Sequence, residues 1–122
     1  MNGKKVLLVY DEKNTLDTYC FLLSKEGYHV VTADNGIKAL EEICQQPFDL
    51  VITDLTIKCK NSHVFLEEMK ALFPILPVMV LTNNLSEIVR RFASLMGACA
   101  LIEKTCSYEI FVSSIKKLLN QD

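Results

Sequence analysis

Residues 48 to 55 read FDLVITDL, in which a run from Leu50 to Thr53 leads directly into Asp54. A continuous run of β-branched and apolar residues, without polar alternation, is typical of a strand that is buried on both faces of a sheet. A carboxylate beside such a run costs free energy unless a partner, a metal ion or water compensates it. The stretch therefore predicts a central strand that carries an acidic group to the edge of a sheet.

Similar runs recur along the chain, and the apolar residues between them repeat with the helical period. The expected strands cover residues 6–10, 29–33, 50–55, 77–82 and 98–102. The first helical stripe consists of Leu16, Tyr19, Cys20 and Leu23. Gly27 and Gly97 follow helical stretches, where a left-handed residue is favoured, and Asp34 is expected to be the N-cap of the second helix.

Strict alternation of strands and helices indicates a parallel sheet, because the connections are too long for hairpins and must cross over in a right-handed sense. The simplest arrangement is a flavodoxin-like, doubly wound α/β fold of five strands in the order 2-1-3-4-5. At 122 residues the chain fits one domain, so a single domain over residues 1–122 without an effector domain is expected.

Composition and charge exclude several classes of function. A net charge of −2 gives no electrostatic case for binding nucleic acid or an anionic membrane directly. The apolar run from Val6 to Tyr10 is too short for a signal peptide or a membrane span. The chain has five cysteines and no CxxC spacing. An odd number without such spacing is typical of reduced thiols in a cytoplasmic protein. The stretch DEKNTLD after the first strand has no glycine, which excludes a P-loop.

Polar residues stand where the expected strands end, and ligands bind at the carboxyl ends of parallel strands near the switch in strand order. The residues are Asp11 and Glu12 after the first strand, Asp54 in the third, Thr82 in the fourth and Lys104 after the fifth. Two neighbouring carboxylates repel unless a cation lies between them, and oxygen ligands of this kind suit Mg²⁺. An ammonium and a hydroxyl suit a phosphoryl group, which a carboxylate such as Asp54 can accept by attacking phosphorus.

These residues give the chain a resemblance to the response-regulator receiver domain over nearly its whole length. The resemblance rests on LLVYDE, Asp54 closing LVITD, Thr82 closing VMVLT, and Lys104 in LIEK. It implies that a phosphohistidine on a sensor histidine kinase or a phosphotransfer protein passes its phosphoryl group to Asp54. The domain would catalyse this transfer on itself and would not be an enzyme acting on small molecules.

The resemblance also implies a metal site and an output face. Mg²⁺ would be held by Asp11, Asp54 and the backbone carbonyl of Thr56, with Glu12 as a substitute ligand. Lys104 and Thr82 would contact the phosphoryl oxygens. Thr82 would also couple phosphorylation to a partner surface made by the fourth helix, the fifth strand and the fifth helix.

Three departures from the family pattern favour an alternative. Tyr10 stands where receivers usually carry the first of two acids, Leu101 stands at the position of the switch aromatic, and Thr105 replaces the proline after the lysine. A degenerate receiver that binds partners by shape, without phosphorylation, would tolerate all three changes. The four polar residues at the strand ends oppose this alternative and favour phosphotransfer.

Overall fold

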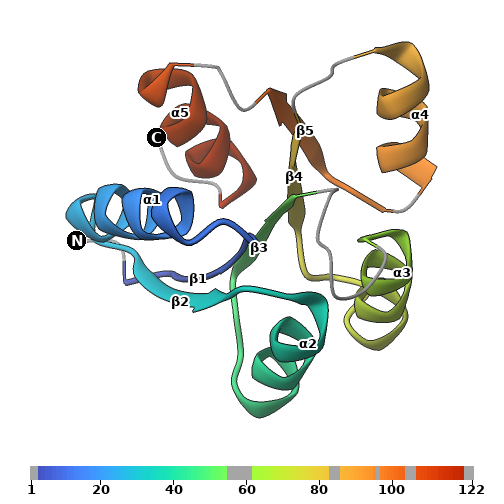
Figure 1. Cartoon of the computed structure of the whole chain (residues 1–122), viewed down its shortest axis with the longest axis horizontal. Helices are drawn as coiled ribbons and strands as arrows, with labels where there is room; N and C mark the ends of the chain where they lie inside the picture. Colours follow the sequence, from blue (N-terminus) through green and yellow to red (C-terminus); the bar gives the residue numbers. More distant parts are fainter. Residues whose placement is uncertain (1–2, 55–61, 83–85, 96, 104–106, 120–122) are drawn as a thin grey trace.

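The computed structural model describes residues 3–54, 62–82, 86–95, 97–103 and 107–119. Within these ranges strands and helices alternate along the chain, as the sequence predicts (Figure 1). The strands are β1 (Lys5–Val9), β2 (His29–Ala33), β3 (Leu50–Asp54), β4 (Val78–Thr82) and β5 (Ala100–Glu103). The helices are α1 (Lys13–Lys25), α2 (Gly36–Gln45), α3 (Ser62–Leu72), α4 (Glu87–Leu95) and α5 (Tyr108–Leu118).

The strands form one parallel sheet in the order β2-β1-β3-β4-β5. Val9 of β1 lies opposite Thr53 of β3, which in turn lies opposite Val80 of β4. The order reverses between β1 and β3, so the predicted doubly wound fold is confirmed. Because all strands run in one direction, the carboxyl ends of β1, β3 and β4 meet at the same edge of the sheet.

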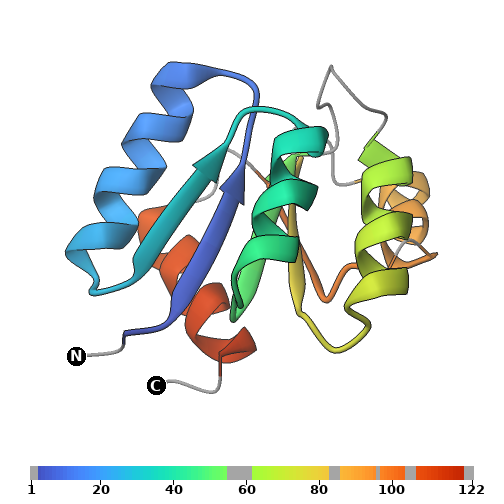
Figure 2. The ribbon, with the colours of Figure 1, turned by 90° about the horizontal axis from the view of Figure 1, so that it is seen from below.

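Helices cover both faces of the sheet, because successive side chains of a strand point to opposite faces (Figures 1 and 2). On one face, Leu8 belongs to a buried cluster with Ile115 of α5. On the other face, Leu7 belongs to a buried cluster with Ile43 of α2 and Met69 of α3. Full burial of side chains of this size contributes roughly 1.5–3 kcal/mol each. The central strands are therefore apolar on both faces, as FDLVITDL indicates.

The start of α2 differs from the expectation by one residue. Asn35, and not Asp34, is the N-cap, and its side-chain oxygen accepts a hydrogen bond of 2.9 Å from the backbone N–H of Lys38. The helix begins at Gly36, and a capping oxygen must stand directly before the first helical residue to reach that N–H. The Asp34 carboxylate instead accepts a hydrogen bond from the side-chain amide of Asn35. The prediction for Asp34 is therefore wrong.

The ends of α3 and α4 contact each other through Lys70 and Gly97. Gly97 has a φ of 91°, which confirms the left-handed conformation expected after a helix, and Gly27 after α1 has a φ of 94°. A Cβ atom at Gly97 would lie 2.9 Å from Cγ of Lys70, so the side chain of Lys70 passes close beneath this backbone. Among the helices of the described ranges, none is long and apolar enough to cross a membrane.

Candidate functional site

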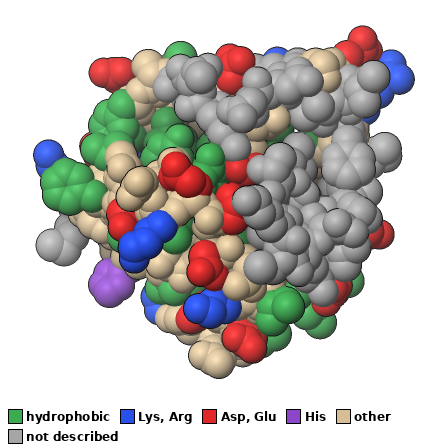
Figure 3. Space-filling view, viewed as in Figure 1, with side chains coloured by type: hydrophobic (Ala, Val, Ile, Leu, Met, Phe, Trp, Pro, Cys, Tyr) green, Lys and Arg blue, Asp and Glu red, His purple; other side chains and the backbone are tan. Residues whose placement is uncertain are grey.

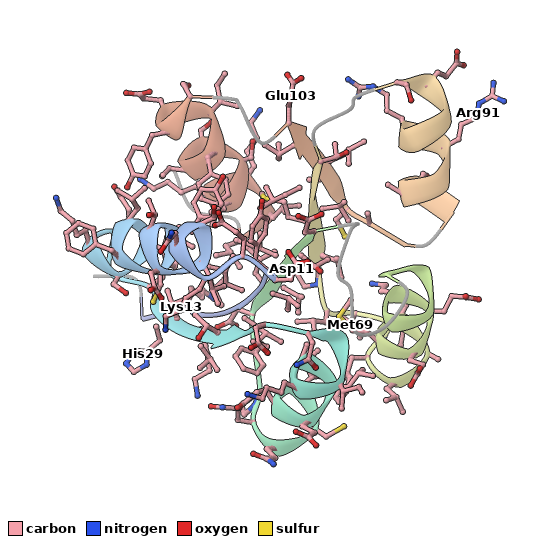
Figure 4. All side chains as sticks on the ribbon, in the orientation of Figure 1. Asp11, Lys13, His29, Met69, Arg91 and Glu103 are labelled. Carbon is pink, nitrogen blue, oxygen red and sulfur yellow. The ribbon has the colours of Figure 1, made fainter. Side chains whose placement is uncertain are left out.

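Three of the predicted site residues lie at the carboxyl edge of the sheet. Asp54 is the last residue of β3, Thr82 is the last residue of β4, and Asp11 follows β1 by two residues. Asp54 is paired with Leu81, so Thr82 lies one step further along the neighbouring strand. Figure 4 shows Asp11 over the middle of this edge, whereas Glu103 at the end of β5 points away from it. The fold thus brings Asp11, Asp54 and Thr82 to one place.

Asp54 and Thr82 are buried, with exposed fractions of 1% and 7%. A buried carboxylate is costly unless polar groups compensate it. In the described part of the chain, every buried side-chain nitrogen or oxygen has a hydrogen-bond partner, so Asp54 is compensated. Asp11 is half-buried. The edge therefore combines the buried carboxylate of Asp54 with the more exposed carboxylate of Asp11. Figure 3 shows acidic side chains near the middle of this face.

Tyr10 occupies the position between β1 and Asp11, and its side chain is directed into the core. It is 8% exposed and belongs to the same buried cluster as Leu8 and Ile52. Its ring meets that of Tyr19 edge to face, with centroids 6.5 Å apart. Continuing the register of β1 and β3 by one residue sets Tyr10 beside Asp54, and strand alternation puts both side chains on the same face. An aromatic ring therefore lines the side of the site that faces α1 and α5.

Glu12 is the N-cap of α1, a role that the sequence analysis did not assign to it. Its Oε1 accepts a hydrogen bond of 2.6 Å from the backbone N–H of Thr15. Hydrogen bonds from the side chain and backbone of Thr15 hold the pKa of the exposed Glu12 carboxyl below its ordinary value of 4.5. The capping bond uses one oxygen of the carboxylate that was expected to be a substitute metal ligand.

The charge of Glu12 should stabilise the fold in a pH-dependent way. Because the pKa is lower in the folded state, the stabilisation is present above pH 4.5 and is lost as the pH falls through the folded-state pKa. Glu12→Gln, which keeps an acceptor oxygen but removes the charge, should lower the melting temperature at pH 7. The difference from the unmodified chain should shrink as the pH is lowered below 4.5, as measured by circular dichroism. A difference that does not change with pH would contradict the assignment.

Lysines also reach this edge, from the beginnings of α1 and α2. A pocket of about 250 Å³ beside Asp11 is lined by Lys13, Asp17, Asp34 and Lys38, among others. The sequence analysis missed these lysines as neighbours of the site. The available signal was their position, because helices that follow parallel strands begin at the carboxyl edge.

Of the other residues singled out in the sequence analysis, Leu101 is described by the structure, whereas Thr56, Lys104 and Thr105 are not. Leu101 is half-buried in β5 opposite Val80, and it packs against the cluster on the α2 and α3 face. Thr56, Lys104 and Thr105 lie outside the described residues. The contacts of Thr56 with a metal ion and of Lys104 with a phosphoryl group therefore stay predictions.

The donor set at the carboxyl edge fits Mg²⁺. Among the described residues, no group of three or more His, Cys, Asp or Glu side chains could hold a metal ion by itself. Mg²⁺ does not need such a group, because it usually keeps several waters and takes one or two carboxylates together with phosphate oxygens. Asp11 and Asp54, at the ends of neighbouring strands, supply two carboxylates of this kind.

An aspartate that closes the central strand of a parallel 2-1-3-4-5 sheet defines a receiver-type α/β domain, and comparison with known proteins agrees. The family model described as response regulator receiver domain matches residues 6–116. The chain therefore belongs to the response regulator receiver domain family of two-component systems.

Relatives and solved structures support this assignment. The transcriptional regulatory protein CreB of Escherichia coli (strain K12) is 28% identical over 99% of this chain and 53% of CreB. The transcriptional regulatory protein ZraR of the same strain is 31% identical over 93% of this chain and 26% of ZraR. The chain thus spans only part of the length of these relatives.

A CheY-like receiver domain protein from Methanospirillum hungatei JF-1 has 27% identity and a TM-score of 0.90, covering 97% of this chain and 94% of that one. Chemotaxis protein CheY4 of Vibrio cholerae, with 24% identity over 96% of this chain and 99% of its own and a TM-score of 0.91, shows the shared fold.

Proposed function

We propose that this cytoplasmic receiver domain accepts a phosphoryl group on Asp54 from a phosphohistidine of a sensor histidine kinase or a phosphotransfer protein. The supporting observation is that Asp54 closes the central strand β3 at the same edge as Asp11 and Thr82. An oxygen of the Asp54 carboxylate attacks phosphorus, and the bond from phosphorus to the donor nitrogen breaks. The imidazole leaves with the electron pair of that bond and takes up a proton, and Asp54 becomes an acyl phosphate.

The other site residues orient the transferred group and balance its charge. Asp11, Asp54 and the backbone carbonyl of Thr56 hold Mg²⁺, with Glu12 as a weaker substitute because it caps α1. When bound, Mg²⁺ neutralises charge on the carboxylates and the phosphoryl oxygens. The hydroxyl of Thr82 and the ammonium of Lys104 contact those oxygens.

Mass spectrometry of the intact chain tests phosphorylation directly. Incubation with acetyl phosphate or phosphoramidate should add one phosphoryl group, and omission of Mg²⁺ should prevent the addition. These donors need no partner protein, so the test does not depend on knowing the kinase. No addition under any of these conditions would favour the alternative, a degenerate receiver that acts by shape, for which the buried Tyr10 and the aliphatic Leu101 are the relevant observations.

The output partner in this proposal is a protein that binds the face formed by α4, β5 and α5, and no nucleic acid is bound directly. Small side chains on α4 and β5, including Ala93 and Ala100, leave a pocket of about 240 Å³ between these elements. Thr82 at the end of β4 is paired with Glu103 at the end of β5. In this proposal a displacement of Thr82 therefore shifts β5 directly, and β5 is part of the output face.

Lys104→Ala should separate signalling from folding. In this proposal the Lys104 ammonium serves the phosphoryl group and not the core, and loss of such a lysine usually changes stability by less than about 0.5 kcal/mol, so the melting temperature should stay nearly constant. The amide shifts that beryllofluoride induces should shrink, because the phosphoryl analogue loses a cationic contact. Lys117→Ala, in the last turn of α5, is the matched control and should respond like the unmodified chain. A large fall in melting temperature would instead make Lys104 a structural residue.

A further inference from the structure

Three aromatic side chains form a row that leads from the edge of the site to α5. The ring of Tyr10 meets that of Tyr19 in α1 edge to face, with centroids 6.5 Å apart. The ring of Tyr19 meets that of Phe111 in α5, with centroids 5.0 Å apart and planes inclined by 32°. Both separations lie in the range of about 4.5–7 Å over which aromatic rings attract each other directly. We call these three residues the aromatic row.

The aromatic row begins beside Asp54. The register of β1 and β3, continued by one residue, sets Tyr10 next to Asp54, and strand alternation puts both side chains on the same face. Both side chains are buried. Protein interiors are close-packed and transmit strain, so a group added to the Asp54 carboxylate changes the space available to the neighbouring ring.

Phosphorylation also changes the charge beside the Tyr10 ring. An aromatic ring has a negative face and a positive edge, so its preferred orientation depends on the charge next to it. The planes of the Tyr10 and Tyr19 rings are inclined by 89°, and a rotation of the Tyr10 ring would alter this edge-to-face contact. A change at Asp54 can therefore reach Tyr19 through one ring.

The aromatic row ends in the first turn of α5. Phe111 is buried in the same cluster as Tyr10, with an exposed fraction of 3%. Ser107, the N-cap of α5, ties this turn together: its carbonyl accepts a hydrogen bond of 3.1 Å from the N–H of Phe111, and its hydroxyl oxygen accepts one from the N–H of Ile110. A displacement of the Phe111 ring therefore moves a hydrogen-bonded unit at the start of α5.

Polar contacts join α1 and α5 at the surface as well. The hydroxyl of Tyr108 donates a hydrogen bond of 2.7 Å to the carboxylate of Glu26, the C-cap of α1. The ammonium of Lys116, further along α5, lies 4.0 Å from the same carboxylate. The two helices lie on one face of the sheet (Figures 1 and 2). We therefore expect α1 and α5 to respond together to a displacement of Tyr19.

We propose that Tyr10 is a positioning residue that couples phosphorylation of Asp54 to α5 through Tyr19 and Phe111. This inference rests on the phosphorylation proposed above and adds a route by which it reaches the output face. Leu101, at the position where the resemblance to receivers implies a switch aromatic, packs against the cluster on the opposite face of the sheet. The aromatic row supplies a contact with α5 that Leu101 does not make from that face.

Amide and aromatic spectra of the unmodified chain, with and without beryllofluoride and Mg²⁺, give the first test. The ring signals of Tyr10, Tyr19 and Phe111 should shift, together with amide signals in the first turns of α5. Amide signals near Thr82 should also shift, because Thr82 belongs to the site. Shifts near Thr82 without shifts of the three rings would overturn this inference alone. The absence of any shift would overturn the phosphorylation of Asp54, and the inference with it.

Tyr19→Leu interrupts the aromatic row at its centre and gives the second test. The shifts that beryllofluoride induces in α5 should lose most of their size, whereas labelling by acetyl phosphate and the shifts near Thr82 should persist, because Tyr19 is outside the residues proposed to bind Mg²⁺ or the phosphoryl group. Lys104 is unchanged in this variant, so the loss would be due to the ring. Tyr19→Phe keeps the ring and should keep the α5 shifts.

Phe73→Leu is the matched control, because Phe73 is a half-buried aromatic residue that packs on the opposite face of the sheet. It should leave the α5 shifts unchanged. A merely structural role of Tyr19 would lower the melting temperature without reducing those shifts, and that result would overturn the inference. An equal loss of the α5 shifts in Tyr19→Leu and Phe73→Leu would do so too. The ring signals of the unmodified chain decide the question even if Tyr19→Leu folds poorly.

Discussion

Asp54→Asn should abolish labelling by acetyl phosphate and Mg²⁺, the largest effect expected of any single change in this chain. The amide of asparagine has the shape of the carboxylate but lacks its negative charge, so it cannot attack phosphorus as the carboxylate does. The variant also removes one of the two carboxylates available to Mg²⁺. Intact mass should therefore show no added phosphoryl group where the unmodified chain shows one.

Asp17→Asn is the matched control for this experiment. Asp17 is an exposed acid of α1 that lines the pocket beside Asp11, so its loss changes the charge near the site without touching the acceptor. It should be labelled like the unmodified chain. Labelling of Asp54→Asn to the same extent would show that Asp54 is not the acceptor, and peptide mapping would then identify the modified residue.

Tyr10→Asp should have two large and opposite effects. Without metal the melting temperature should fall, since removing a buried aromatic side chain costs about 3–5 kcal/mol and the new carboxylate repels Asp11 and Asp54. With Mg²⁺ the added charge should attract the cation and lower its dissociation constant by at least about tenfold, given the strength of charge interactions at such short range. The rise of melting temperature with Mg²⁺ concentration measures both effects, because a ligand that binds only the folded state stabilises it by mass action.

Two further variants separate packing from charge at this position. Tyr10→Asn loses the same ring as Tyr10→Asp without adding a charge, and Tyr10→Phe keeps the ring. Neither should bind Mg²⁺ more tightly than the unmodified chain. If Tyr10→Asp and Tyr10→Asn give the same Mg²⁺ titration, residue 10 does not face the metal, despite the register that sets it beside Asp54.

The fold was predictable because its determinants are local and repeated. The run from Leu50 to Thr53 shows no alternation of apolar and polar residues, and such a strand must be central in a sheet whose two faces are both covered by helices. The bounds of strands were less predictable, because they depend on pairing. Tyr10 is apolar enough to extend β1, but β1 ends at Val9. The fifth strand was expected from residue 98, but it begins at Ala100, where pairing with Met79 starts.

The parts of the site that sequence missed depend on geometry. Asp34 and Asn35 are both good capping residues, and only the position at which α2 begins decides between them. The resemblance to receivers implies that Tyr10 stands at the position of an acid, but the sequence cannot show that its ring packs on Tyr19. The pocket beside Asp11 joins the starts of α1 and α2, which are distant in the chain, so no local pattern indicates it.

The strands of the sheet differ in how deeply they are buried, and this difference affects which parts of the domain open to solvent most easily. Every residue of β3 and β4 is buried, whereas every residue of β5 is only half-buried and β5 has a single neighbour, β4. Amide hydrogen exchange in proteins follows such differences, since weakly covered edge elements open locally while central strands open only when the whole domain unfolds. We therefore expect β3, which carries Asp54, to be among the slowest-exchanging parts of the molecule. We expect β5, which forms part of the proposed output face, to open at a lower free energy than β3 and β4.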